Sequence, residues 1–213
     1  MKRVWYHNKV YWISIVTVLA VLIVLADVAT YHGIHKLQAT GESTGLVVDH
    51  HDDHAARAKG KIKLTYDSYQ YTDQKTYHLN RDVNSWDHAN IKINSVTIYK
   101  LAKDYQRIGL DGKSGNCVML INMTIKANQD ISIYPTQGTV STNNGLQANA
   151  MMGDQDFDGD IDNGIVKTGD VVVVFNHVKN INDIKKLRFK FEAFGKSDDD
   201  VSNKQYDLHL NLK

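Results

Sequence analysis

Five aspartates occupy alternate positions of one short segment, a spacing that is typical of loops that bind calcium. They are Asp154, Asp156, Asp158, Asp160 and Asp162. Together with a glycine at position 159 they match the first half of the pattern D-x-[DN]-x-[DN]-G, in which carboxylate oxygens surround one ion. The twelfth position holds Ile165 instead of a bidentate glutamate, so the sequence excludes an EF-hand. A looser, weak calcium site and a solvated acidic loop between strands both remain open.

Histidines form a second group of possible ligands. Half of the ten histidines lie between residues 30 and 60. If residues 49–59 are helical, His50 and His54 share one face and can chelate a transition metal such as zinc, nickel or copper. His51 stands where the zinc-protease motif H-E-x-x-H needs its glutamate, so this is no protease signature. The alternative to a weak metal site is a polar tether whose imidazoles titrate near neutral pH.

The other chemically reactive residues favour no catalytic site. A single cysteine, Cys117, excludes an internal disulfide and every multi-cysteine zinc site, and its place in an apolar strand predicts a buried, inert thiol. The segment Gly112–Ser114 resembles the end of a P-loop, but Arg107 occupies the place of the first glycine, so we expect a turn. No nucleophile elbow or Ser/His/Asp order stands out. We therefore predict no enzyme activity and no cofactor, calcium excepted.

Two surfaces could meet a partner. Tyr69, Tyr71, Tyr77 and Trp86 would suit a sugar platform, although such residues more often belong to the core of a sandwich. The cluster of basic residues over positions 185–190 is expected on the solvent-exposed face of a strand. The formal net charge of +1 gives no general attraction to polyanions. We expect an envelope protein or a glycan as partner, and no nucleic acid.

The amino-terminal region is predicted to hold the protein in a membrane. Residues 10–26 carry no charge, and at ~1.5 Å per helical residue they cover most of the bilayer core. We predict a transmembrane anchor helix over residues 10–29. Lys2, Arg3 and Lys9 precede it, which predicts a cytoplasmic segment 1–9 and an extracellular position for everything after the helix. Cleavage by signal peptidase after Ala26, which would release a secreted protein, is the alternative.

Between the anchor and the folded part, residues 30–60 lack a sustained apolar period and contain many glycines, histidines and aspartates. This composition predicts a polar, solvated stalk.

Residues 61–213 are predicted to form one antiparallel β-sandwich, because apolar residues alternate with polar ones in run after run. The first run contains Ile62, Leu64 and Tyr66. The apolar parity changes between residues 93 and 96, which predicts a bulge or a break at Asn94-Ser95. Residues 117–125 are apolar on both parities at their start, which predicts a central strand. Asn144-Gly145 predicts a hairpin turn. We expect eight or nine short strands and no amphipathic helix.

Several segments of this body resemble a known family. They are Tyr134–Gly138, Asn144–Gly145, Phe157–Ile161, Gly164, Lys167–Gly169 and Leu187–Phe189. They are similar to the immunoglobulin-like, telokin-like extracellular domains of unknown function in surface proteins of lactic-acid-type Gram-positive bacteria. The resemblance covers about residues 61–213 and implies an immunoglobulin-like fold and an extracellular location, with no established activity. The chain lacks the lipid-bearing cysteine of the lipoprotein members.

The sequence thus predicts a single-pass membrane protein of the cell envelope that presents a non-catalytic binding or structural domain outside the cell. The alternatives are a calcium- or transition-metal-responsive module, which would use residues 154–162 or the stalk histidines, and the same domain released by cleavage.

Overall fold

The computed structural model describes residues 58–109, 111–196 and 202–213, which all belong to one compact unit, residues 52–213. The predicted cytoplasmic segment, anchor helix and nearly all of the stalk, with His50 and His54, lie outside these residues, as does the acidic run Asp198–Asp200. Within the described residues no helix is long and apolar enough to cross a membrane.

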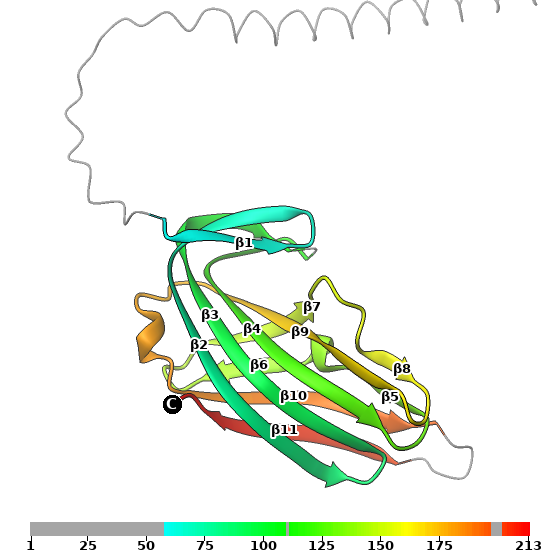
Figure 1. Ribbon diagram of the computed structural model, residues 1–213. Helices are drawn as coiled ribbons and strands as arrows, with labels where there is room; N and C mark the ends of the chain where they lie inside the picture. Colours follow the sequence, from blue (N-terminus) through cyan, green and yellow to red (C-terminus); the bar gives the residue numbers. More distant parts are fainter. Residues whose placement is uncertain (1–57, 110, 197–201) are drawn as a thin grey trace, which may run out of the picture. The chain divides into compact units, whose positions relative to one another are not determined.

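The described part of the chain is all-β, as predicted, and its strands pair antiparallel throughout (Figure 1). The strands are β1 (Gly60–Leu64), β2 (Asp67–Trp86), β3 (Ala89–Ile108), β4 (Lys113–Ala127), β5 (Ile131–Ile133), β6 (Thr139–Thr142), β7 (Gln147–Met152), β8 (Gly159–Ile161), β9 (Val166–Phe175), β10 (Lys186–Gly195) and β11 (Asn203–Asn211). Two short 3-10 turns, η1 (Pro135–Gln137) and η2 (Ile181–Asp183), are the helical elements of these residues. The expectation of short strands was wrong for β2 and β3, which each run for 20 residues.

The strands form two layers (Figure 1). Sheet A contains β1, β2, β3, β4 and β9 in that order, and sheet B contains β6, β10 and β11 with the short strands β5 and β8. Strand β7 belongs to both sheets. Its first half pairs with β6 from Gln147 to Asn149, and its second half pairs with β9 from Ala150 to Met152. A strand that changes sheets in this way closes one side of a sandwich.

The main core fills the space between the two sheets. Alternate residues of each strand point inward, so sheet A contributes Ile91, Ile98, Met119 and Ile121 while sheet B contributes aromatic and leucine side chains. The side chains of sheet B in this core include Leu187, Phe189, Phe191, Tyr206 and Leu208. Each fully buried side chain of this size stabilises the fold by about 1.5–3 kcal/mol. Cys117 is also fully buried here, which confirms the predicted burial of its thiol, and this burial raises the pKa of the thiol to about 12.

A second, smaller core lies on the outer face of sheet A. The central strands β4 and β9 are apolar on this face too, through Val118, Val172 and Val174. These valines are covered by β1, the beginning of β2 and the end of β3, which we call the apical lobe and which brings Ile62, Leu64, Tyr69, Leu101 and Ile108. Figure 1 shows this lobe folded over one end of the sheet.

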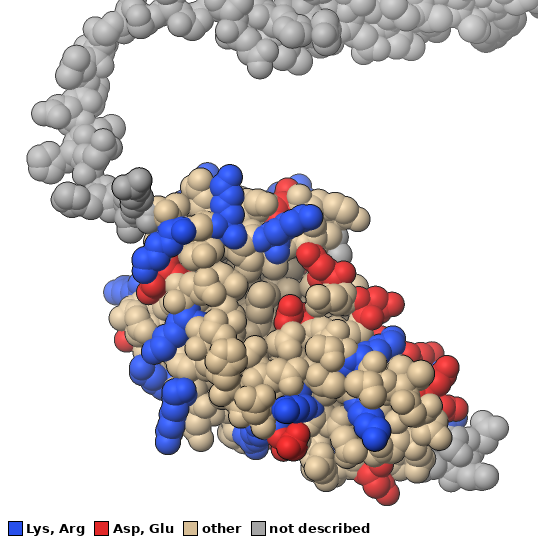
Figure 2. All heavy atoms as spheres, viewed as in Figure 1, with Lys and Arg blue, Asp and Glu red and all other residues tan. Residues whose placement is uncertain are grey.

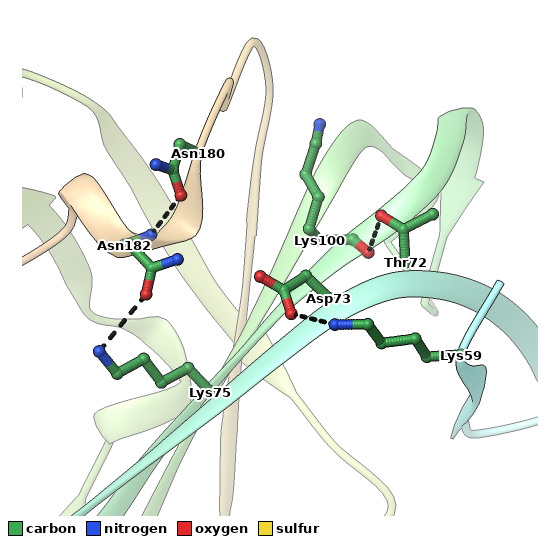
Figure 3. Close-up of polar contacts among 7 residues, drawn as sticks. All are labelled: Lys59, Thr72, Asp73, Lys75, Lys100, Asn180 and Asn182. Atoms are coloured by element: carbon green, nitrogen blue, oxygen red, sulfur yellow. Dashed lines mark hydrogen bonds and ion pairs between the residues drawn. The ribbon is translucent and has the colours of Figure 1, made fainter. Parts of the chain in front are cut away.

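Irregular pairing lets the long strands bend into the apical lobe. Strand β3 advances from Lys100 to Tyr105 while β4 moves only from Cys117 to Gly115, so β3 bulges outward. Polar contacts stabilise the bent region (Figure 3). Lys59 Nζ forms an ion pair with Asp73 at 2.8 Å, and Thr72 Oγ1 donates to the carbonyl of Lys100 at 3.4 Å.

The tip of the lobe corrects one prediction. Tyr66, predicted as an inward residue of the first strand, is 89% exposed, because the chain turns at Thr65 and Tyr66 between β1 and β2. Thr65 has a φ of 55°, which is unfavourable for a β-branched residue, and its N–H donates to the side chain of Asp154.

Other local predictions were confirmed. The register of β3 against β4 shifts between Ile93 and Ser95, so Asn94 is the bulged residue. Asn144 and Gly145 lie in the turn between β6 and β7, with a φ of 82° at Gly145. Gly112 lies in the turn before β4, with a φ of 61°.

The small core should contribute to the stability of the whole domain. We predict that Leu101→Ala lowers the free energy of unfolding by about 2–5 kcal/mol, because it leaves a cavity between the lobe and sheet A. Urea unfolding of residues 52–213 measures this change. The control is Gln106→Ala on the exposed face of the same strand, which should change stability by less than about 0.5 kcal/mol. Equal effects of the two substitutions would contradict a buried lobe.

Candidate functional site

The acidic segment does not gather its carboxylates around one point. Asp154 accepts the N–H of Thr65, and Asp158 is buried and accepts both the N–H and the hydroxyl of Thr136. Asp160 accepts the hydroxyl of Ser132 and pairs with a lysine, Lys196 Nζ, at 2.6 Å. Contact with Lys196 is the main reason that the pKa of Asp160 lies below its usual value.

These contacts use three of the five aspartates in separate places. Asp156 and Asp162 are exposed. In the described residues no group of three or more His, Cys, Asp or Glu side chains is arranged to hold a metal ion. The calcium site therefore stays a prediction from the sequence.

The four aromatic residues that could have formed a sugar platform belong mainly to the hydrophobic cores, which was the more frequent outcome expected from the sequence. Tyr69 and Tyr77 are each 3% exposed, and Trp86 lies in the main core. Tyr71 packs edge-on against Tyr99 in the apical lobe, with ring centroids 5.1 Å apart. These rings hold the lobe and the core together and offer no surface on which a sugar could stack.

A histidine that the sequence did not single out lies at the turn between β2 and β3. His88 Nδ1 is 3.0 Å from Asp87, and its Nε2 is 3.4 Å from the hydroxyl of Ser202. The order resembles a Ser-His-Asp triad, but the imidazole is stacked on Trp86 at 4.6 Å and its side chain is only 8% exposed. A buried ring cannot reach a substrate, so these contacts join the β2–β3 turn to the segment that leads into β11.

Strand β10 lies in the middle of sheet B, and its outward side chains form the centre of an exposed face. It pairs with β11 on one side and with β6 and β5 on the other. Alternation puts the leucine and phenylalanines of residues 187–191 into the core and turns the residues between them outward. We call this outward surface the β10 face; it comprises Thr139, Ser141, Arg188, Lys190, Glu192, Phe194, Gln205, Asp207 and His209.

An irregularity in the strand beside β10 shapes this face. Ala193 of β10 stands opposite Ile133, and Lys190 stands opposite Thr139. The interval from Lys190 to Ala193 is three residues long, whereas the interval from Ile133 to Thr139 opposite it is six residues long. The segment β5–β6 therefore pairs with β10 like one strand into which three extra residues are inserted. The extra residues form η1, Pro135–Gln137.

Contacts on both sides hold the η1 segment in this position. The N–H of Tyr134 donates to the carbonyl of Glu192 at 3.0 Å, and buried Asp158 accepts two hydrogen bonds from Thr136. Gly138 then returns the chain to the sheet. A Cβ atom there would lie 2.4 Å from the carbonyl oxygen of Lys190, so only glycine permits this approach.

The η1 segment borders a hollow of about 460 Å³, which we call the η1 hollow. It falls within the range of ~300–1,000 Å³ typical of small-ligand sites. One end carries two aromatic rings, Tyr134 and Phe194, with centroids 6.2 Å apart. The rest of the wall comes from Gln137, Gly138, Thr139, Lys190, Phe191, Glu192 and Gln205.

Four polar side chains of the η1 hollow keep their hydrogen-bonding groups available. Gln137, Lys190, Glu192 and Gln205 make no side-chain hydrogen bond or ion pair with any other residue in the described parts of the chain. Their amide, ammonium and carboxylate groups can therefore bond to a ligand.

A smaller hollow of about 250 Å³ lies at the other end of the β10 face. Its main polar groups already form hydrogen bonds or ion pairs within the fold. Asn143 accepts the N–H groups of Lys185 and Lys186 and donates to the carbonyl of Asp183. Arg188 makes a two-pronged pair with Asp207 at 2.8 and 2.6 Å. This pair is the main reason that the pKa of Asp207 lies below its usual value. The η1 hollow is therefore the better candidate site.

Comparison with known proteins gives distant structural likenesses. No protein-family model and no curated protein matches the sequence. A crystal structure of a functionally unknown protein from Listeria monocytogenes EGD-e is 11% identical, with a TM-score of 0.44 over 66% of this chain and 88% of that one. A conserved hypothetical protein from Bacillus anthracis is 13% identical, with a TM-score of 0.39 over 66% of this chain and 97% of that one.

The sequence pattern missed the η1 hollow because its walls are far apart in the chain. The alternation in residues 187–190 correctly predicted that Arg188 and Lys190 face water. In the sequence, Tyr134 stands out only as part of the segment Tyr134–Gly138 that resembles a known family. Its position beside Phe194 follows from the pairing of β5 with β10, which no local pattern specifies.

The role of Asp158 can be tested directly. We predict that Asp158→Ala lowers the free energy of unfolding by about 1.5–3 kcal/mol, because a charged acceptor of two hydrogen bonds is lost. The loss should be the same in calcium and in a chelator, since Thr136 already holds the carboxylate. Asp156→Ala, at an exposed position of the same segment, is the matched control and should have almost no effect. A loss seen only with calcium present would show that the carboxylate binds the ion instead.

The pair on the β10 face gives a prediction of pH dependence. Because Arg188 lowers the pKa of Asp207 in the folded state, the pair stabilises the fold above the usual value of 3.8 and ceases to do so as pH falls through the lowered value. We predict that Arg188→Ala raises the pKa of Asp207 toward 3.8, as measured by NMR titration of its carboxyl carbon. Lys190→Ala should raise it less, because Lys190 acts only through longer-range attraction. An unchanged pKa in Arg188→Ala would show that the pair does not form in solution.

Proposed function

We propose that this chain is a membrane-anchored, non-catalytic binding module of the cell envelope. In this proposal residues 10–29 anchor it, residues 1–9 lie in the cytoplasm, and residues 30–60 form a stalk. The remainder is an extracellular, immunoglobulin-like sandwich that binds an envelope component through the η1 hollow. The two-layer antiparallel architecture supports the immunoglobulin-like assignment, since such domains pack two antiparallel sheets around one core.

The membrane part of the proposal rests on the sequence. The uncharged run over residues 10–26 is long enough to span the hydrocarbon, and the three basic residues before it favour a cytoplasmic amino terminus. A single cysteine, buried as a thiol, is compatible with an extracellular domain that needs no disulfide.

The binding part rests on one observation. The η1 hollow combines two aromatic rings with four polar side chains that form no hydrogen bond or ion pair within the described residues. Strand alternation turns Lys190, Glu192 and Gln205 outward, and their position around one recess beside two aromatic rings supports ligand binding.

A catalytic role is not proposed. Asp87, His88 and Ser202 are the residues that come closest to a catalytic arrangement in the described chain, and the imidazole among them is buried against Trp86. Neither of the two hollows on the β10 face includes any of these residues.

Protease treatment of intact cells tests the location. We predict that cells expressing the full chain release peptides from residues 58–213, that no peptide from residues 1–9 appears, and that the rest of the chain sediments with membranes. A variant that lacks residues 1–29 is the control and should be protected inside the cell. Protection of the full chain in intact cells, with cleavage only after lysis, would contradict the proposal. Release of residues 27–213 into the medium would replace the anchor with signal-peptide cleavage.

Envelope binding is tested separately. We predict that purified residues 52–213, which contain both hydrophobic cores, sediment with isolated cell envelopes in a saturable manner. Sedimentation that does not saturate, or that is equal in Tyr134→Ala, would contradict binding through the η1 hollow.

A further inference from the structure

We propose that the ligand of the η1 hollow is a neutral oligosaccharide. This inference rests on the proposed function and deepens it by naming the class of ligand. The chemistry of the wall, the position of the aromatic rings and the pairing of β10 each support it.

The charges of the wall favour a neutral ligand. Lys190 and Glu192 are two residues apart on the same face of β10, so the recess carries one positive and one negative group. An anionic polymer would meet the carboxylate, and a cationic one would meet the ammonium group. The recess therefore offers no net attraction to either.

The polar groups of the wall match sugar hydroxyls. The amides of Gln137 and Gln205 and the hydroxyl of Thr139 can both donate and accept hydrogen bonds, while Lys190 donates and Glu192 accepts. A sugar hydroxyl also donates and accepts, so neighbouring hydroxyls on a ring can be satisfied by a mixed wall of this kind. An apolar ligand would leave these groups without partners at a cost in affinity.

The aromatic end gives the apolar contact that such a ligand needs. Tyr134 and Phe194 are partly buried, and their rings meet at an interplanar angle of 59°. An aromatic ring packs well against the C–H face of a pyranose, which is the apolar side of an otherwise polar molecule.

The pairing of β10 disfavours an extended peptide. Peptides commonly bind a sheet by adding a strand to an open edge. Strand β10 is paired with β11 along one side and with β6 and β5 along the other, and the gap between β6 and β5 is occupied by η1. A peptide in the η1 hollow could not use main-chain pairing with β10, whereas a sugar does not need it.

The test is titration of purified residues 52–213, labelled with ¹⁵N, with neutral tetrasaccharides of glucose, galactose and N-acetylglucosamine, followed by NMR shifts. We expect at least one tetrasaccharide to bind saturably and to shift the amides of residues 134, 136–139 and 190–194. Tyr134→Ala and Gln205→Ala should each weaken this binding about tenfold or more.

Matched controls separate loss of contact from loss of fold. Tyr66→Ala removes an aromatic ring that is 89% exposed on the apical lobe, and Gln74→Ala removes an exposed amide from β2. Both controls should bind like the unchanged domain. Unfolding curves of all four variants should agree with that of the unchanged domain, so that a weaker affinity reports the lost contact. If Tyr134→Ala does not fold, Gln205→Ala, at an exposed strand position, carries the test.

The outcomes distinguish this inference from the proposed function. Saturable binding that both hollow variants weaken supports the saccharide. Failure of all three tetrasaccharides to bind, while the domain still sediments with envelopes through the η1 hollow, would overturn the saccharide and leave the binding module in place. Failure of both experiments would overturn the proposed function as well. Equal binding by the hollow variants and the controls would overturn the location of the site.

Discussion

The structure depends on a pair of central strands that are apolar on both faces. In β4 and β9, Met119 and Val173 point toward sheet B while Val118 and Val172 point the opposite way. Neither face can remain in water, because each exposed side chain of this kind would forfeit about 1.5–3 kcal/mol. Sheet B covers one face, and the chain must supply a second cover for the other. The length and the bending of β2 and β3 follow from this requirement.

The second cover explains why so many tyrosines of the domain are unavailable to a partner. Tyr69 accepts the N–H of Gly109 at 3.2 Å and packs edge-on against Tyr105, whose hydroxyl accepts the N–H of Gln70 at 3.0 Å. These rings fill the lobe and also satisfy its backbone where the strands leave the sheet. Figure 2 shows basic and acidic side chains interspersed on the visible face, so no field of a single sign covers it. Recognition through a hollow of mixed chemistry agrees better with this distribution than recognition by charge alone.

The parts of the fold that could be predicted from the sequence are those that depend on neighbouring residues. The bulge at Asn94, the turn at Gly145 and the double-sided burial around Cys117 each follow from a short pattern, and the structure has all three. The failures concern residues whose environment is set by distant segments. The alternation that ends at Tyr66 continues the pattern of a strand, but the turn at Thr65 is held by Asp154, which is 89 residues away. Tyr77 and Trp86 are buried, as such residues usually are in a sandwich, although the sequence left a platform open because only the position of sheet B determines their burial.

Asp158 of the acidic segment has a structural role that the sequence pattern did not predict. Asp158 is a buried carboxylate, and such a group persists in a protein interior only when hydrogen bonds compensate for lost water. Its two partners are both on Thr136, in the middle of the three extra residues that separate β5 from β6. The two hydrogen bonds hold η1 in its position beside β10. The buried carboxylate therefore stabilises a departure from regular pairing, and this departure borders the recess in which Tyr134 meets Phe194.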